Sequence, residues 1–134
     1  MRITPTALEI WLVACYPARL EPCPFCNIDQ SRIRLENEYA IAFFYAHPVN
    51  DGHILVVPRQ HASTIYDLEI AEQFAIWNLV AQARDILLLQ MNPDGFSIGF
   101  TEGLSREETI SHVHVHVIPR RYGDALSRGA GFDT

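Results

Sequence analysis

The sequence has few basic residues, and this shortage excludes one broad class of function. Its 134 residues include 10 Lys and Arg against 16 Asp and Glu, so the formal net charge is −6 at pH 7. General binding to nucleic acid requires a basic surface that neutralises phosphates. We therefore expect no nucleic-acid partner, and we expect any phosphate compound to be attracted locally, by histidines and backbone amides.

Long apolar runs, internal repeats and low-complexity segments are also missing. No run approaches the roughly 20 residues that span a bilayer, so we expect no membrane partner. The 3 cysteines are an odd number, which does not suit the disulfide framework of a secreted protein and favours a reducing cytoplasm. The length, with 49% hydrophobic residues, is typical of one globular domain.

The N-terminal segment contains a Leu-Val-Ala-Cys sequence that is similar to a bacterial lipoprotein cleavage site. Its apolar run is interrupted by Glu9 and is too short for a signal peptide. Thr4 as N-cap, followed by a proline at the first helical position, instead predicts a short helix. We interpret residues 1–21 as a helical extension and residues 22–134 as the main domain.

Cys23 and Cys26 form a Cys-x-x-Cys pair. Such a pair is half of a tetrahedral zinc site, or a redox motif when it follows a strand in a βαβ unit. No βαβ pattern flanks it, which favours zinc over redox chemistry and over two free structural cysteines. The other half of a zinc site must come from histidine, and the candidates are His47, His61 and His112.

The central part of the chain alternates between strand and turn signals. Residues 32–45 indicate a β-hairpin with a polar turn, and residues 53–58 indicate a buried strand with His53 at its start. Residues 96–100 indicate another short strand, followed by a polar loop over 101–111.

One long helix is predicted from about Leu68 to Met91, where apolar residues recur near helical spacing and Asp67 is the expected N-cap. We interpret its aromatic residues, Phe74 and Trp77, as core residues of a broad apolar face that packs on a sheet and extends into an interface.

Histidine and valine alternate over residues 112–118, which predicts a β-strand. Because successive strand side chains point to opposite faces, His112, His114 and His116 share one face and the valines share the other. The valine face can pack on a core. The histidine face cannot, unless each ring nitrogen finds a hydrogen-bond partner.

The histidine face has three interpretations. It can carry surface or hydrogen-bonded histidines of an edge strand, or a catalytic metal site, since imidazole is a common zinc ligand. It can also serve phosphate chemistry, because a neutral imidazole is a competent nucleophile at pH 7. We favour the third, for the following reason.

This stretch resembles the His-φ-His-φ-His-φ-φ motif (φ, apolar) of the histidine triad (HIT) family of nucleotide hydrolases and transferases. Further similar segments follow the family's order over roughly residues 22–125: Cys-Pro-Phe-Cys, Gly-His-Ile-Leu-Val-Val-Pro-Arg-Gln-His, the long helix, Asp-Gly-Phe-Ser-Ile-Gly and Ile-Pro-Arg. The final Arg-Tyr-Gly-Asp resembles bacterial members related to dinucleoside polyphosphate hydrolases. The resemblance implies an α+β fold with a five-stranded antiparallel sheet and one long helix, usually in a homodimer.

The resemblance also implies catalytic roles. His114 would attack the α-phosphorus of a nucleotide to form a nucleotidyl-histidine, from which water releases a nucleoside monophosphate. His116 would donate to the phosphate and the leaving group, and His53 would support that network. The third triad histidine favours hydrolysis over transfer. The alternatives are a nucleotide-binding or interaction protein with little turnover, a nucleotidyltransferase, and a metal-dependent hydrolase.

Members of the family that bind zinc imply a closed, structural site made here by Cys23, Cys26, His61 and His112. Mg²⁺ bound with the substrate is the other cofactor that we consider.

The positions that would face the substrate are partly altered. Thr109 matches the family's Ser/Thr before the triad. Tyr45 replaces an aspartate that binds ribose, Thr101 replaces an asparagine that contacts phosphate, and Glu108 replaces a glutamine. We therefore expect an intact catalytic core with changed nucleotide specificity.

Overall fold

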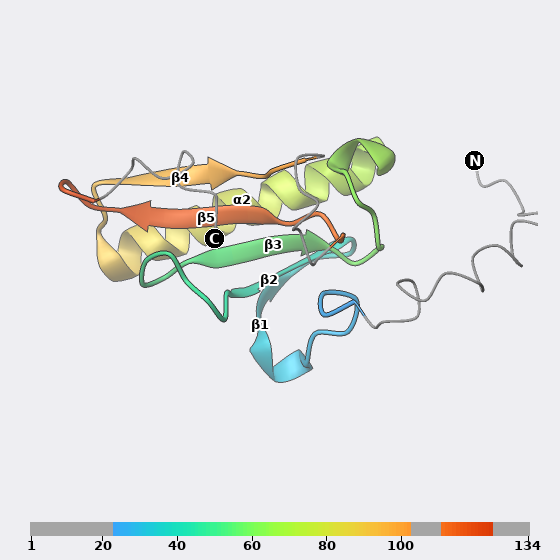
Figure 1. The fold of residues 1–134 in the computed structure, drawn as a ribbon, viewed down its shortest axis with the longest axis horizontal. Helices are drawn as coiled ribbons and strands as arrows, with labels where there is room; N and C mark the ends of the chain where they lie inside the picture. Colours follow the sequence, from blue (N-terminus) through green and yellow to red (C-terminus); the bar gives the residue numbers. More distant parts are fainter. Residues whose placement is uncertain (1–22, 103–110, 125–134) are drawn as a thin grey trace, which may run out of the picture.

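A five-stranded antiparallel sheet carries one long helix on one face in the computed structural model, which describes residues 23–102 and 111–124 (Figure 1). The strands and helices are β1 (Ile33–Glu36), β2 (Ala40–Phe44), β3 (Ile54–Pro58), α2 (Ile70–Met91), β4 (Gly95–Gly99) and β5 (Val115–Arg120), with short 3₁₀ helices η2 (Gln30–Arg32) and η3 (Ile65–Asp67). The strand order is β1-β2-β3-β5-β4. The predicted α+β fold is confirmed. The predicted N-terminal helix and the boundary at residues 21 and 22 lie outside the described residues.

Asn37 shapes the β1–β2 hairpin and joins it to the helix. Its Oδ1 accepts from the backbone N–H groups of Tyr39 (3.0 Å) and Ala40 (2.9 Å), while its Nδ2 donates to the Ala75 carbonyl of α2 at 2.9 Å. A side chain that bonds its own backbone two or three residues ahead favours a tight turn. The sequence prediction of a hairpin with a polar turn here is therefore confirmed.

The helix begins two residues later than predicted. Glu69 is the N-cap and forms a capping box with Glu72. The predicted N-cap Asp67 is wrong, because this residue ends η3, a separate turn whose N-cap is Thr64. Asn92 ends α2 in the left-handed conformation, with φ of 45°. No helix among the described residues is long and apolar enough to cross a membrane.

The main core lies between α2 and the sheet. It contains Ile76, Leu79, Ala83 and Leu87 of the helix, packed with the valines that alternate with the triad histidines. Phe74 and Trp77, interpreted from the sequence as core, are 70% and 40% exposed. Because the sheet covers only one side of α2, these two residues lie on the side that it leaves uncovered.

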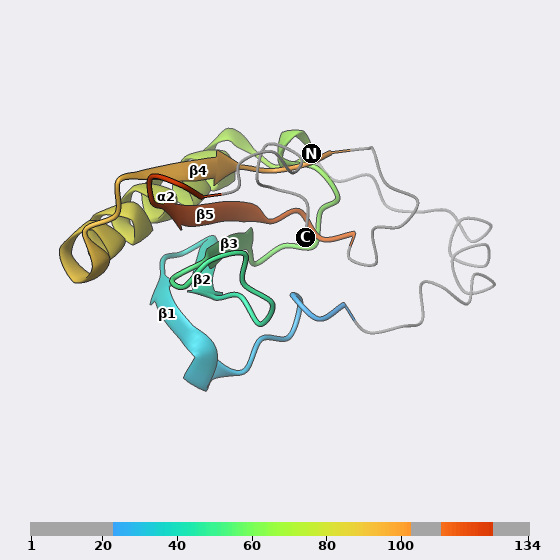
Figure 2. The ribbon, with the colours of Figure 1, turned by 60° about the vertical axis from the view of Figure 1, so that its left-hand side comes forward.

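The opposite face of the sheet carries a smaller cluster. Phe25, Phe43, Leu55 and Val57 are buried there. Phe25 belongs to the loop before η2, which runs along this face, away from α2 (Figure 2). The histidine side chains described next lie on the same face.

Candidate functional site

β5 begins at Val115, three residues after the predicted start of the histidine strand. His112 and His114 therefore precede the ladder, whereas His116 pairs with β3 and β4. The valines of the segment belong to the core under α2. The predicted separation of valines from histidines is thus confirmed, although only His116 lies within the strand.

His53 and His116 form a buried hydrogen-bonded pair. His53 Nε2 lies 2.8 Å from His116 Nδ1, and the two side chains are 1% and 3% exposed. The Val49 backbone N–H donates to His53 Nδ1 at 3.0 Å. Because Nδ1 of His53 accepts, the proton of its neutral ring lies on Nε2 and is donated to His116. A neutral His116 then carries its own proton on Nε2.

Burial keeps this pair uncharged. It lowers the pKa of His53 to about 4, with smaller electrostatic effects from Arg120 and His114. It also lowers the pKa of His116 to about 3, with smaller effects from His114 and His53. Both rings are therefore neutral hydrogen-bond donors at pH 7.

Gly52 explains how His53 reaches this position. Its φ is +87°, and a Cβ added there would lie 2.5 Å from the Met91 Sδ. Glycine alone among the residues tolerates that backbone readily and lets the loop lie against the end of α2. The turn then delivers His53 directly into the start of β3.

The free energy of unfolding should fall as the pH falls from about 6.5 to 4.5. In this window the unfolded chain binds protons on His53 and His116, whereas the folded chain does not, so stability rises with pH. Each histidine contributes a slope of about 1.4 kcal/mol per pH unit. Urea unfolding at several pH values measures it, and His53→Gln should reduce the slope by about one such contribution. An unchanged slope in that variant would contradict the assignment.

His114 has the opposite tautomer to His116. Its Nδ1 lies 2.8 Å from the backbone carbonyl oxygen of His112, to which it donates. The proton of the neutral ring is therefore on Nδ1, and Nε2 keeps its lone pair. The ring is half-buried and lies 5.2 Å, centroid to centroid, from both Phe25 and His116. An unprotonated nitrogen beside a neutral donor suits nucleophilic attack on phosphorus.

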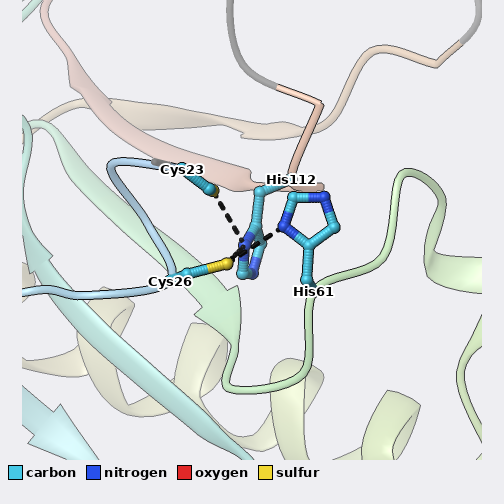
Figure 3. A group of neighbouring side chains, drawn as sticks. All are labelled: Cys23, Cys26, His61 and His112. Atoms are coloured by element: carbon cyan, nitrogen blue, oxygen red, sulfur yellow. Dashed lines mark hydrogen bonds between the residues drawn. The ribbon is translucent and has the colours of Figure 1, made fainter. Parts of the chain in front are cut away.

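Cys23, Cys26, His61 and His112 come together from three chain segments (Figure 3). One ligand atom from each lies within 4.8 Å of all the others. His112 Nδ1 is 3.4 and 3.5 Å from the sulfurs of Cys23 and Cys26, and His61 Nδ1 is 3.0 Å from Cys26 Sγ. Tetrahedral zinc with ordinary bond lengths separates sulfur and nitrogen ligands by about 3.6 Å. The donor set and its spacing thus fit a four-ligand zinc site.

The other ring nitrogens of the two histidines are also engaged. His112 Nε2–H donates to the Pro58 carbonyl at 2.8 Å, and His61 Nε2 lies 3.3 Å from Ser111 Oγ. Such partners orient ligating imidazoles toward a metal. Burial, followed by the neighbouring Cys23, raises the pKa of Cys26 to about 11. Metal binding would therefore release a thiol proton.

The structure separates His47 from the cysteines, so it is not one of the clustered ligands. Its ring lies 5.9 Å from that of Tyr45, which in turn contacts the rings of His53 at 5.0 Å and His116 at 6.3 Å. Tyr45 thus lies beside His53 and His116. Thr101 follows β4 two residues after Gly99, which pairs with His116. Thr109 and Glu108 lie outside the described residues.

The two arginines after the triad have structural contacts. Arg121 donates to the carbonyls of Met91 and, at 2.7 Å, Asn92, so it caps the C-terminus of α2. The buried Arg120 donates through Nε to Ser97 Oγ at 2.9 Å. The sequence analysis did not find these contacts, because neither motif nor spacing identifies a partner.

The fold and the site define a protein with a histidine triad on an antiparallel sheet. Residues 28–123 match the family model described as HIT domain, and the chain therefore belongs to the HIT family.

Individual HIT proteins are also similar to this chain. An uncharacterized HIT-like protein of Mycoplasma genitalium is 36% identical over 102 residues, 73% of this chain and 72% of that protein. A bis(5'-adenosyl)-triphosphatase of Dictyostelium discoideum is 31% identical over 97 residues, 72% of this chain and 65% of that protein. The crystal structure of a HIT family member from Bacillus subtilis has a TM-score of 0.69 at 28% identity, covering 85% of this chain and 80% of that one.

Proposed function

We propose that this protein is a hydrolase that cleaves a nucleoside polyphosphate or phosphoramidate at its α-phosphate. The observation that carries the proposal is the pattern of ring hydrogen bonds. It leaves a lone pair on His114 Nε2 and a proton on His116 Nε2. Similarity to a bis(5'-adenosyl)-triphosphatase supports the same chemistry.

In the first step, His114 Nε2 attacks the α-phosphorus and forms a P–N bond as the bond to the leaving group breaks. His116 keeps its Nε2 proton and donates it in a hydrogen bond to the departing oxygen or nitrogen, which leaves with the electron pair of the broken bond and takes any proton that it needs from solvent. In the second step, water attacks the nucleotidyl-histidine and loses a proton to solvent as the P–N bond breaks. A nucleoside monophosphate leaves, and His114 regains its lone pair. Covalent catalysis thus divides one difficult displacement into two easier ones.

Neutral histidines make this sequence possible near pH 7. A protonated His53 could no longer accept from the Val49 N–H at Nδ1, so the hydrogen-bond network from Val49 through His53 to His116 would lose its first bond. The low pKa of His53, about 4, keeps this hydrogen-bond network intact near pH 7.

The decisive experiment is a rapid-quench reaction with diadenosine tetraphosphate and with adenosine 5'-phosphoramidate, analysed by mass spectrometry. We expect a transient mass gain of one nucleotidyl group, followed by release of AMP. Nucleotide binding without a mass gain would favour a binding module instead. Delivery of the nucleotidyl group to an added phosphate acceptor, faster than to water, would favour a nucleotidyltransferase.

We propose that Tyr45, Thr101, Thr109 and Glu108 contact the substrate around this centre. The ring contacts of Tyr45 with His53 and His116 support its assignment. A phenol cannot accept from two ribose hydroxyls as a carboxylate can, which favours a changed nucleoside specificity.

Glu108→Gln should raise kcat/KM by about tenfold or more, because it replaces a carboxylate near the substrate phosphates with a neutral amide. Like charges some 5 Å apart repel by roughly 3 kcal/mol at an effective dielectric of about 20, and salt and rearrangement reduce this. A tenfold gain corresponds to about 1.4 kcal/mol. Steady-state kinetics on both substrates measure the effect. Equal or lower kcat/KM on both would contradict a role for Glu108 at the phosphates.

We propose that the Cys/His cluster holds one Zn²⁺, and that Mg²⁺ accompanies the polyphosphate of the substrate. Four protein ligands close the coordination sphere, so this zinc would support structure rather than bind substrate. Both described cysteines are free thiols, which supports a reducing, cytoplasmic location.

We further propose a homodimer. Tyr66, Ile70, Phe74 and Trp77 are 70%, 63%, 70% and 40% exposed along η3 and α2, and Phe100 contacts the rings of Tyr66 and Trp77. Such an apolar patch is rare on a monomer. It adjoins β4, an edge strand of the described sheet that contains neither lysine nor proline to protect it. A second copy related by a two-fold axis would cover both features.

Phe74→Glu should convert the dimer to a monomer, because it places a charge in the apolar patch. Sedimentation velocity at micromolar concentration measures the change. Leu89→Glu is the matched control, since Leu89 is 88% exposed on the same helix but lies outside the patch. A monomeric wild type, or an unchanged sedimentation coefficient in Phe74→Glu, would contradict this interface.

A further inference from the structure

His112 contributes to both the candidate metal site and the hydrogen bond that holds the His114 ring. Its side chain is fully buried, with Nδ1 facing the two cysteine sulfurs (Figure 3). Its Nε2–H donates to the Pro58 carbonyl. Its own backbone carbonyl accepts the Nδ1–H of His114 at 2.8 Å. One residue therefore joins the candidate metal ligands to the candidate nucleophile.

That carbonyl decides which nitrogen of His114 is protonated. A neutral imidazole has one N–H, and a carbonyl facing Nδ1 stabilises the proton there. If the carbonyl turned away, the two tautomers would approach each other in energy. Part of the population would then carry the proton on Nε2 and could not attack phosphorus.

The peptide that carries the carbonyl lies outside the strand ladder, since β5 begins at Val115. The N–H of this same peptide unit, which belongs to Val113, donates to the Ala62 carbonyl at 2.7 Å. His61 and His112 directly precede these two bonded residues, and their rings are 4.9 Å apart. A metal bound to both histidines would therefore hold in place the two backbone segments that this hydrogen bond joins.

Phe25 is a second residue that links the candidate metal ligands to His114. It lies between the two cysteines in sequence and is buried, with its ring centroid 6.1 Å from His112 and 5.2 Å from His114. Both contacts are close to perpendicular, at 77° and 72°, a favourable aromatic geometry. The loop that offers two sulfur ligands thus also packs against the nucleophilic ring.

We propose that the Cys23, Cys26, His61 and His112 cluster, with its metal bound, positions the nucleophile. It does so by holding the His112 carbonyl and the Phe25 ring against His114. The inference rests on the proposed function, and it adds an effect on turnover to the structural role of the metal. His112 and Phe25 are positioning residues in this scheme, because they act on the substrate through His114.

The test compares the zinc-loaded full chain with the same protein stripped by a chelator. The ¹⁵N shifts of the His114 ring report which nitrogen is protonated, and kcat and KM are measured with diadenosine tetraphosphate while the protein is folded. We expect a single Nδ1–H tautomer in the loaded protein. The stripped protein should show mixed tautomers, with kcat reduced by about tenfold or more and KM changed by less than about threefold.

Phe25→Leu separates positioning from metal loss, because all four ligands remain. We expect this variant to bind zinc normally, to lose the single tautomer and to show a reduced kcat. If the stripped protein unfolds, this variant still tests whether the positioning of His114 determines its tautomer and kcat. Leu79→Ala is the matched control: it destabilises the core between α2 and the sheet, on the face opposite the histidine side chains, and should change neither the tautomer nor kcat.

The proposal is overturned if Phe25→Leu, or the stripped and folded wild type, keeps both the single Nδ1–H tautomer and the wild-type kcat. Failure of the hydrolase function would look different. In that case the loaded wild type forms no nucleotidyl adduct, while the tautomer still responds to metal removal and supports the positioning role.

Discussion

His114→Ala should lower kcat/KM by at least about 10³-fold, equivalent to about 4 kcal/mol of transition-state stabilisation. The substitution removes the lone pair on Nε2 that would attack the α-phosphorus, and no other described ring has the same arrangement. His116 carries its proton on Nε2 because Nδ1 accepts from His53. It therefore cannot replace His114 as the nucleophile.

The measurement is single-turnover hydrolysis of diadenosine tetraphosphate, together with the mass of the quenched protein. We expect neither a nucleotidyl adduct nor a burst of AMP from His114→Ala. Tyr122→Ala is a suitable control, because Tyr122 is 91% exposed and has no role in the proposed site. Near-normal turnover by a folded His114→Ala protein would refute the covalent mechanism.

Loss of the metal is expected to have the largest effect on stability. We expect metal analysis to find about one zinc per chain, and Cys23→Ser to lower the melting temperature by about 10 °C or more. The reason is that the ligands join the loop before η2, the loop after β3 and the segment before β5. Without the ion these segments are joined by weaker contacts, including a Cys23–His112 contact of 3.4 Å.

Differential scanning fluorimetry with and without a chelator measures this effect. Cys15→Ser is the matched control, since it changes a cysteine outside the Cys-x-x-Cys pair. If the purified protein contains no metal, melts as high as the zinc-treated protein and ignores chelators, the zinc site is wrong.

Local patterns predicted most of the sheet and its helix. Alternation with period two indicated that the valines and histidines of the triad segment separate, and the valines indeed pack under α2. Helical spacing of the apolar residues located the end of α2 at Met91. These predictions succeeded because side-chain periodicity depends on backbone geometry alone.

Predictions that depended on contacts between distant segments were less successful. Phe74 and Trp77 were interpreted as core, yet α2 turns them away from the sheet. Asp67 was the expected cap, but a separate turn at η3 uses it and leaves Glu69 to cap the helix. In each case the residue type was compatible with both the predicted and the observed position, and the packing of the neighbouring element determined which one occurs.

The sequence by itself determined the chemistry that is available: three alternating histidines, a further histidine before a buried strand, and a Cys-x-x-Cys pair. Residue spacing left His47, His61 and His112 open as partners of the cysteines, and only the family resemblance pointed to His61 and His112. The sequence could not determine which ring nitrogens carry protons. The tertiary structure decided both, since a neutral imidazole takes its tautomer from the donors and acceptors around it. Here the Val49 N–H and the His112 carbonyl, contacts that no motif encodes, leave a proton on Nε2 of His116 and a lone pair on Nε2 of His114.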